Sequence, residues 1–310
     1  MPKPFITYQQ QIALLKGKHL TVPDNLEAER ILADIGYFTL IGGYKHPFKN
    51  KTTKLYKDGV TFDDIVKLYE FDETLRRLFL RYLLMIERRI KARIAYVFCD
   101  MHGDLQQEYL NTANYTNDPR KTAGIQRLIT TLSQLAIRPT DYPYINHHQT
   151  VHHNVPLWVL MNAVTFGSAS KMFGFLPQSL QSKIARDYPL NIRQLDQMLS
   201  VLTKYRNACA HSERLFSYVT RDDIPDLLLH AKLGISKNGN QYECGKHDLF
   251  AVVIAFRYLL PVKTFGEFKR QLAREIESFI KNCPALPETD LMREMGFPQN
   301  WKNVTRRYKL

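Results

Sequence analysis

The chain has 310 residues, of which 45% are hydrophobic, 12% aromatic and 24% charged, a balance typical of a folded protein and unlike that of a disordered or membrane-spanning one. Its 43 lysine and arginine residues exceed its 30 aspartate and glutamate residues, which gives a formal net charge of +13. This surplus favours nucleic acid as the partner, because basic side chains that neutralise phosphates release counterions. The alternative is that the charge only aids solubility.

The cysteines are far apart and form no C-x-x-C pair, so the sequence predicts neither a zinc knuckle nor a disulfide framework. The first residues lack an apolar signal core, and no stretch reaches the roughly 18 apolar residues that span a bilayer. We therefore expect a cytoplasmic protein without membrane contact, cofactor or metal.

Apolar residues recur at helical spacing through most of the chain, which predicts an all-α fold. The expected helices cover residues 8–15, 24–35, 61–103, 119–137, 156–176, 177–186, about 191–211, 248–260 and 265–280. Prolines, glycines and polar residues predict an irregular segment over 36–59 and a long loop over 138–156. Thr61 and Asp64 have the spacing of a capping box at the start of the longest helix.

This organisation divides the chain into an N-terminal accessory region (1–60), a main helical domain (61–283) and a basic C-terminal tail (284–310). The polar side of the 61–103 helix gathers arginines that we expect to contact RNA phosphates: Arg76, Arg77, Arg81, Arg88, Arg89 and Arg93. A solvated helix face with salt bridges is an equal alternative.

The run RNACAH, residues 206–211, lies near the end of the helix that begins at about Asn191. A buried stripe is predicted on one side of that helix: Leu195, Met198, Leu202, Tyr205 and Cys209. At about 100° per residue, Asn207 and His211 lie one turn apart on the other side, while Arg206 and His211 diverge by about 140°.

Arginine, asparagine and histidine suit RNA cleavage by the RNA's own 2′-hydroxyl, a reaction that needs proton transfer and charge neutralisation but no metal. Histidine side chains exchange protons near neutral pH, arginine stabilises phosphate charge, and an amide holds an imidazole or a phosphate. On spacing alone the pattern is common by chance, and a histidine at a surface helix end is the alternative. One histidine does not readily serve both sides of the displacement, so we predict a symmetric homodimer with a shared cleft.

Two further groups of side chains have competing interpretations. A histidine-rich segment at residues 147–153 lacks acidic or cysteine partners at ligand spacing, so His148 and His152 are predicted to approach RNA rather than a metal. Trp158 and Phe166 lie in an apolar segment and are predicted to be core residues rather than a base-stacking platform.

Long segments of the sequence resemble the Abi-like family of abortive-infection proteins (AbiD/AbiF type), whose members carry a HEPN-type Arg-Asn-x3-His motif. The segments are KPFITYQQQIALLKGKHL, GYFTLIGGYKHPF, FDDIVKLYEFDETLRRLFLRYLLMIERRIKARI, VPLWVLMNAVTFGSASKMF and KYRNACAHSERLF, which cover most of residues 3–216. The resemblance implies a HEPN-type helical bundle for residues 61–283.

The resemblance also implies a metal-independent endoribonuclease in anti-phage defence, with a composite site in a dimer. Arg206 would contact the scissile phosphate, Asn207 would support the site, and His211 would be the general acid or base. The implied target is RNA, such as transfer RNA, and a small non-coding RNA is an implied regulator or partner. Two alternative functions remain open. One is a non-catalytic RNA-binding module, favoured by the charge outside the motif, and the other is a protein-interaction sensor of infection.

Overall fold

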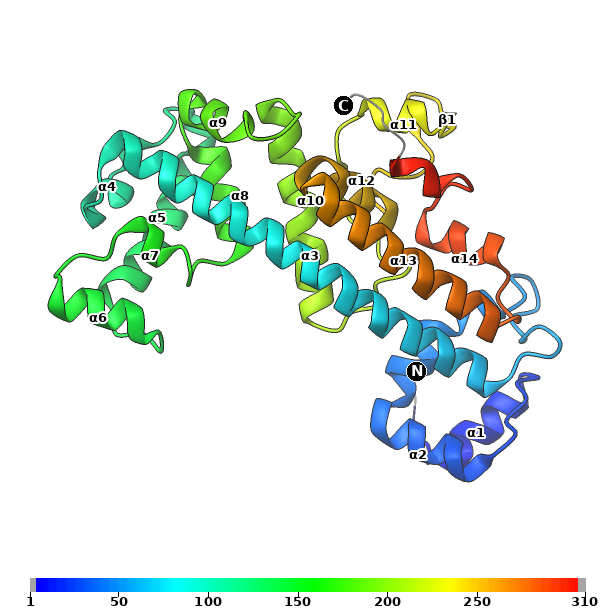
Figure 1. Cartoon of the computed structure of the whole chain (residues 1–310). Coiled ribbons are helices and arrows are strands. Elements are labelled where there is room, and N and C mark those ends of the chain that lie inside the picture. The colour runs from blue at the N-terminus through cyan, green and yellow to red at the C-terminus, as the bar shows by residue number, and fades with distance from the viewer. Residues whose placement is uncertain (1–3, 306–310) are drawn as a thin grey trace.

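The computed structural model describes residues 4–305 and is an all-α bundle, as the sequence predicts (Figure 1). Strand structure in the described residues is limited to a hairpin of β1 (Lys237–Asn238) and β2 (Gln241–Tyr242) and two isolated bridges. Helix α3 (Phe62–His102) runs diagonally through the molecule and carries helices along its whole length (Figure 1). At 1.5 Å per residue, its 41 residues span about 60 Å.

The predicted capping box at the start of α3 is confirmed. The Thr61 hydroxyl accepts a hydrogen bond from the Asp64 amide at 3.2 Å, and the Asp64 carboxylate accepts one from the Thr61 amide at 2.9 Å. The helix ends at Gly103, whose φ of +88° favours glycine. Because neither proline nor glycine occurs between these ends, α3 continues without a break.

The N-terminal helices lie at the beginning of α3 (Figure 1): α1 (Tyr8–Lys16), α2 (Asn25–Ile35), the π-helix η1 (Phe38–Gly42) and the 3-10 turn η2 (His46–Phe48). Asp24 caps α2 by accepting hydrogen bonds from the amides of Leu26 and Glu27. The segment predicted to be irregular contains η2 and also η1, which buries Leu40 and Ile41.

Smaller helices gather at the opposite end of α3 (Figure 1): α4 (Gln106–Leu110), η3 (Thr112–Asn114), η4 (Pro119–Lys121), α5 (Thr122–Ile137), α6 (Pro143–Val151) and α7 (Leu157–Leu160). Three more helices lead back to the middle of the molecule: α8 (Phe166–Phe175), α9 (Gln178–Ala185) and α10 (Ile192–Ala210). Helix α10 crosses α3 there (Figure 1).

The rest of the chain lies on the side of α3 where α13 packs along its N-terminal half (Figure 1): α11 (Leu228–Lys232), α12 (Leu249–Leu259), α13 (Val262–Asn282), α14 (Glu288–Met295) and η5 (Trp301–Thr305). Helix α13 packs along α3 through aromatic pairs, such as Phe79 with Phe268 at 5.2 Å between ring centroids. Within the predicted basic tail, Trp301 is buried against Phe297, and residues 306–310 lie outside the described residues.

Two predictions of secondary structure are wrong. The segment predicted as a long loop contains α6, because Pro143 fits the first turn of a helix and Ile145 supplies a buried anchor. The apolar run over 156–176 is not one helix but two. Thr165 caps α8 by accepting a hydrogen bond from the Ser168 amide at 3.1 Å, and a turn separates it from α7.

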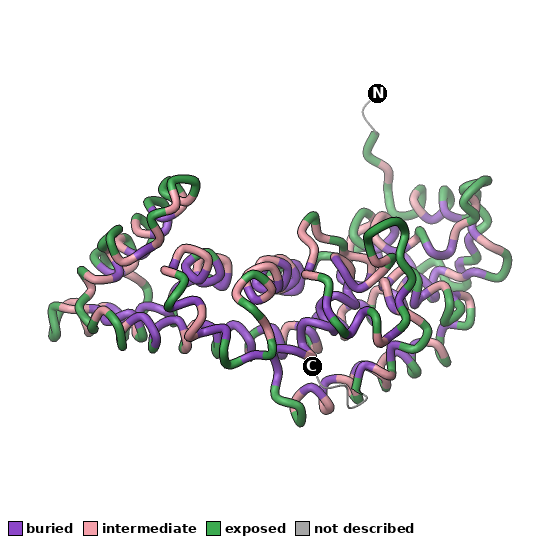
Figure 2. The backbone as a smooth tube through the Cα atoms, turned by 90° about the horizontal axis from the view of Figure 1, so that it is seen from above, coloured by how far each residue is buried: buried purple, intermediate pink, exposed green. Residues whose placement is uncertain are grey.

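Buried residues follow α3 and the faces of the helices packed on it, while exposed residues lie on the outer turns and loops (Figure 2). Helix α12 is the most apolar, with ten of its 11 residues buried. Among residues 4–305, no helix combines the length and the apolar character needed to cross a membrane.

Gly296, at the end of α14, packs closely against the start of α12. Its φ is +72°, and a β-carbon there would lie 2.3 Å from Cγ of Asp248, the residue that caps α12. Replacing Gly296 with alanine is expected to lower the free energy of unfolding by about 2–4 kcal/mol, since it combines left-handed strain with displacement of a helix cap. Urea denaturation measures the loss. Gly43→Ala is the matched control, because Gly43 has helical backbone angles and open space around it.

Candidate active site at the end of α10

Helix α10 presents the RNACAH run on a rigid support. Asn191 and Gln194 form a capping box at its start, with both hydrogen bonds at 2.9 Å. The predicted apolar stripe is confirmed, since all five of its residues are buried: Leu195, Met198, Leu202, Tyr205 and Cys209. The Tyr205 hydroxyl also donates to the carbonyl of Tyr218 at 2.7 Å, which ties the helix to the chain that follows it.

The three predicted catalytic residues lie at the exposed end of this helix. Asn207 and His211 are exposed, and the Arg206 side chain is 29% exposed. His211 is the C-cap, and its amide donates to the Asn207 carbonyl at 2.9 Å, so the two residues are one turn apart as predicted. No side-chain hydrogen bond joins Asn207 to His211 within residues 4–305. Ser212 follows with a φ of +55°, which turns the chain away from the helix.

Arg206 is held by an acidic residue of α3. Its Nε lies 3.0 Å from Oε2 of Glu87, while Nζ of Lys91 lies 2.7 Å from the other oxygen, Oε1. Glu87 is 7% exposed, so its carboxylate is buried between two cations. In the described part of the chain, both terminal nitrogens of Arg206 lack a hydrogen-bond partner, so both can donate to a phosphate.

A second buried carboxylate fixes the chain just after the motif. Asp72 of α3 is fully buried and accepts hydrogen bonds from the amides of Leu215 and Phe216, at 2.9 and 2.5 Å. It also accepts from the Tyr44 hydroxyl at 2.7 Å and from Arg76 at 2.6 Å. Burial raises the pKa of the Asp72 carboxyl, and these donors oppose the shift. The segment that follows His211 is therefore anchored in the core.

Arg76 belongs to this buried cluster and not to a surface stripe. Its side chain is 6% exposed and also donates to the Glu213 carbonyl at 3.4 Å. Burial lowers its pKa, but the neighbouring Asp72 and Tyr44 outweigh that effect and raise it, so the guanidinium stays charged. The expected phosphate contact of Arg76 does not fit this position, because a buried guanidinium committed to Asp72 is not open to a ligand.

The other predicted RNA-binding arginines divide into two groups. Arg77 and Arg81 are exposed and line a groove with α13, and Arg88 is exposed further along α3. Arg89 is also exposed but donates to the Leu259 carbonyl at 2.9 Å, and the partly buried Arg93 lies 2.8 Å from Asp187. The solvent-facing stripe therefore lacks Arg76, and Arg93 is only partly open to solvent.

The predicted histidine group lies on and just after α6, at the far end of α3. Its rings are close together, with 4.9 Å between the centroids of His148 and His152 and 5.3 Å between those of His147 and His152. His148 is half-buried and His152 is exposed. Within residues 4–305, no group of three or more histidine, cysteine, aspartate or glutamate side chains is arranged to hold a metal ion.

Cys209, inside the motif, is 5% exposed, and burial raises the pKa of its thiol to about 12. A neutral buried thiol is a poor nucleophile, so the chemistry of the run belongs to its other polar residues.

Trp158 and Phe166, both predicted to be core residues, differ in outcome. Phe166 is 1% exposed as predicted, but the prediction for Trp158 is wrong, since it is 49% exposed.

The fold and the site define an all-α protein that presents arginine, asparagine and histidine at one helix end. The profile of the Abi-like protein family matches residues 30–217, a range that contains α3, Asp72 and the whole motif. The chain belongs to this family, and membership suggests abortive-infection defence as its setting. Neither the curated proteins nor the solved structures contain a significant match.

Proposed function

We propose that this chain is a metal-independent RNA endonuclease of the HEPN type that acts in the cytoplasm during abortive infection. The observation that carries the proposal is the arrangement at the end of α10. Exposed His211 lies one turn from Asn207, and Arg206 of the same helix has terminal nitrogens without a partner in the described chain. The anchored segment 213–216 restricts the positions that His211 can take.

In this reaction the 2′-oxygen of a ribose attacks the adjacent phosphorus and the 5′-oxygen of the next nucleotide leaves. The base removes the proton of the 2′-hydroxyl, and the acid supplies a proton to the leaving oxygen. The products are a 2′,3′-cyclic phosphate and a 5′-hydroxyl. His211 is the proton-transfer group and Arg206 neutralises charge on the phosphate oxygens. Once RNA is bound, the Asn207 amide holds the imidazole or the phosphate by a hydrogen bond.

The site is proposed to be shared by two chains. On α10, Arg206 and His211 diverge by about 140°, and Glu87 holds Arg206 toward α3. A two-fold axis near the end of α10 would place Arg206 of one chain opposite His211 of the other. Such a cleft supplies two histidines, one for each proton transfer.

The test compares the native chain with His211→Ala on structured and unstructured RNA in EDTA. Loss of one general acid–base group is expected to slow cleavage by about 10²–10⁴-fold, while RNA affinity stays within about threefold. His46→Ala is the matched control, because His46 is an exposed histidine of η2 outside the predicted RNA contacts, and this variant should cleave at the native rate. Retained cleavage by His211→Ala would contradict the proposed chemistry. If the native chain binds RNA but cuts none, the binding-module hypothesis replaces it.

A further inference from the structure

A groove of about 630 Å³ runs between α3 and α7 and begins beside the candidate active site. Its walls include Leu84, Arg88, Tyr96, Trp158, Met161 and Asn162. Its volume lies within the range of about 300–1,000 Å³ that is usual for small-molecule sites. The groove is therefore large enough for a nucleotide, and its lining suggests which part of one it would accept.

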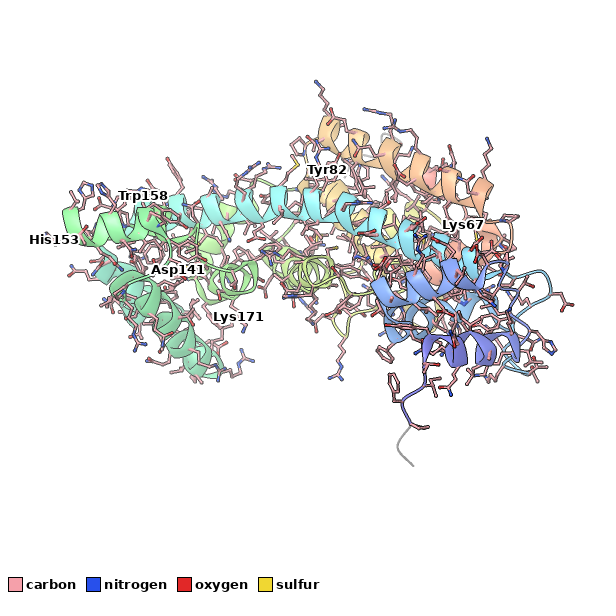
Figure 3. All side chains as sticks on the ribbon, turned by 90° about the horizontal axis from the view of Figure 1, so that it is seen from below. Lys67, Tyr82, Asp141, His153, Trp158 and Lys171 are labelled. Carbon is pink, nitrogen blue, oxygen red and sulfur yellow. The ribbon has the colours of Figure 1, made fainter. Side chains whose placement is uncertain are left out.

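Three apolar side chains are exposed in this groove although the core is close by. Tyr96 is 65% exposed, Trp158 49% and Leu84 43%. In Figure 3, Trp158 lies beside the ribbon of α3, toward the end of that helix that is remote from Lys67. The neighbours of Trp158 on α7, Leu157 and Leu160, are buried, so the helix uses them as its core contacts and leaves the indole at the groove. Exposed aromatic faces of this kind stack on unpaired bases.

The acidic side chains that line the groove are already paired with cations, so a basic side chain remains available for a phosphate. Glu87 is already paired with Lys91 and Arg206, and Asp100 lies 3.4 Å from Lys183. Arg88 has no hydrogen-bond or ion-pair partner in residues 4–305 and lines the same groove. An aromatic site flanked by an available guanidinium matches a base and its phosphate, and it does not match a purely apolar ligand.

The groove is also continuous with the motif. Glu87 is one of its lining residues and the direct partner of Arg206 at 3.0 Å. From Glu87 to Tyr96, the groove follows α3 for about 13 Å at 1.5 Å per residue. A strand whose phosphate lies at Arg206 can therefore extend along α3 toward Trp158.

We propose that this groove binds an unpaired base of single-stranded RNA next to the cleaved bond, with Trp158 and Tyr96 as its stacking surfaces and Arg88 on the adjoining phosphate. The proposal rests on the proposed function, since that function supplies the RNA strand at Arg206. A second copy of the chain is a less suitable occupant. Standard protein interfaces use about 20–30 residues on each side, whereas eleven residues line this groove.

The first test measures affinity for a short single-stranded RNA at one fixed salt concentration, with all chains carrying His211→Ala to prevent cleavage. Adding Trp158→Ala is expected to weaken binding by about tenfold to a hundredfold, the effect of losing one base–aromatic stack. Trp158→Phe retains an aromatic ring and should bind within about threefold of the parent. Phe5→Ala is the matched control, because Phe5 is 91% exposed but does not line the groove.

The second test uses tryptophan fluorescence, which remains informative even if Trp158→Ala does not fold. The chain has two tryptophans, and Trp301 is buried at 1% exposure, so a change on adding RNA reports Trp158. Quenching that disappears in Trp158→Phe supports the proposal. An unquenched signal together with unchanged affinity of the tryptophan variants overturns it. So does conversion of a dimer into monomers by Trp158→Ala without loss of RNA affinity, because the groove would then hold a second chain.

The outcomes separate this proposal from the nuclease proposal. If the native chain cuts no RNA but its fluorescence is quenched and Trp158→Ala weakens binding, the groove proposal stands and the nuclease proposal fails. If RNA is cut at the native rate by Trp158→Ala and no quenching occurs, the nuclease proposal stands and the groove proposal fails.

Discussion

Replacing Asp72 with alanine is expected to lower the free energy of unfolding by about 3–5 kcal/mol, the usual effect of removing one partner of a buried ion pair. Asp72 is fully buried, and its loss leaves the guanidinium of Arg76 without its carboxylate at 6% exposure. The amides of Leu215 and Phe216 lose their acceptor at the same time. Each buried donor without a partner adds a desolvation cost.

Equilibrium unfolding in urea measures this change, and Glu70→Ala is the matched control. Glu70 is an exposed acidic residue of the same helix, and its replacement should alter the free energy of unfolding by less than about 0.5 kcal/mol. Hydrogen exchange adds a local measurement, since the amides of Leu215 and Phe216 should exchange faster in Asp72→Ala. Equal stability of the two variants would show that the cluster around Asp72 does not anchor the segment after His211.

The helical phase of the sequence contains a signal for this cluster. Asp72 comes four residues after Leu68 and three before Leu75, so it lies on the buried side of α3. A carboxylate at such a position requires buried donors. The sequence does not reveal which donors these are, because Tyr44 and the Leu215 amide are distant along the chain and approach only after folding.

Local patterns predicted most of the helices and the exposed end of α10, since capping residues and apolar periodicity act within a few turns. The errors occur where tertiary contacts decide the outcome. The orientation of Trp158 depends on the break between α7 and α8, and the burial of Arg76 depends on Asp72 and Tyr44. The partnership of Arg206 with Glu87 joins residues 119 positions apart, so spacing along one helix could not indicate it.

Mixing two inactive chains is expected to restore RNA cleavage if the active site is shared. Arg206→Ala and His211→Ala should each cleave at less than about 1% of the native rate, because each lacks a group that acts in the transition state. After joint refolding or co-expression, half of the dimers contain one chain of each kind. In a mixed dimer, the remaining Arg206 and His211 come from different chains, so one arginine–histidine pair of the cleft is restored while its second histidine is missing.

Random pairing therefore predicts recovery to at most about one quarter of the native rate, half of the dimers with half of their arginine–histidine pairs. The control mixes Arg206→Ala with the double variant Arg206→Ala/His211→Ala, a combination that lacks Arg206 throughout and should remain inactive. Sedimentation measured in parallel must give a dimer for the mixed chains. If the arginine and the histidine of one chain act together, mixed dimers contain no complete pair and no recovery occurs. Native cleavage by a monomer would contradict the shared site in the same way, because the angle between Arg206 and His211 on α10 would then be compatible with a site built from a single chain.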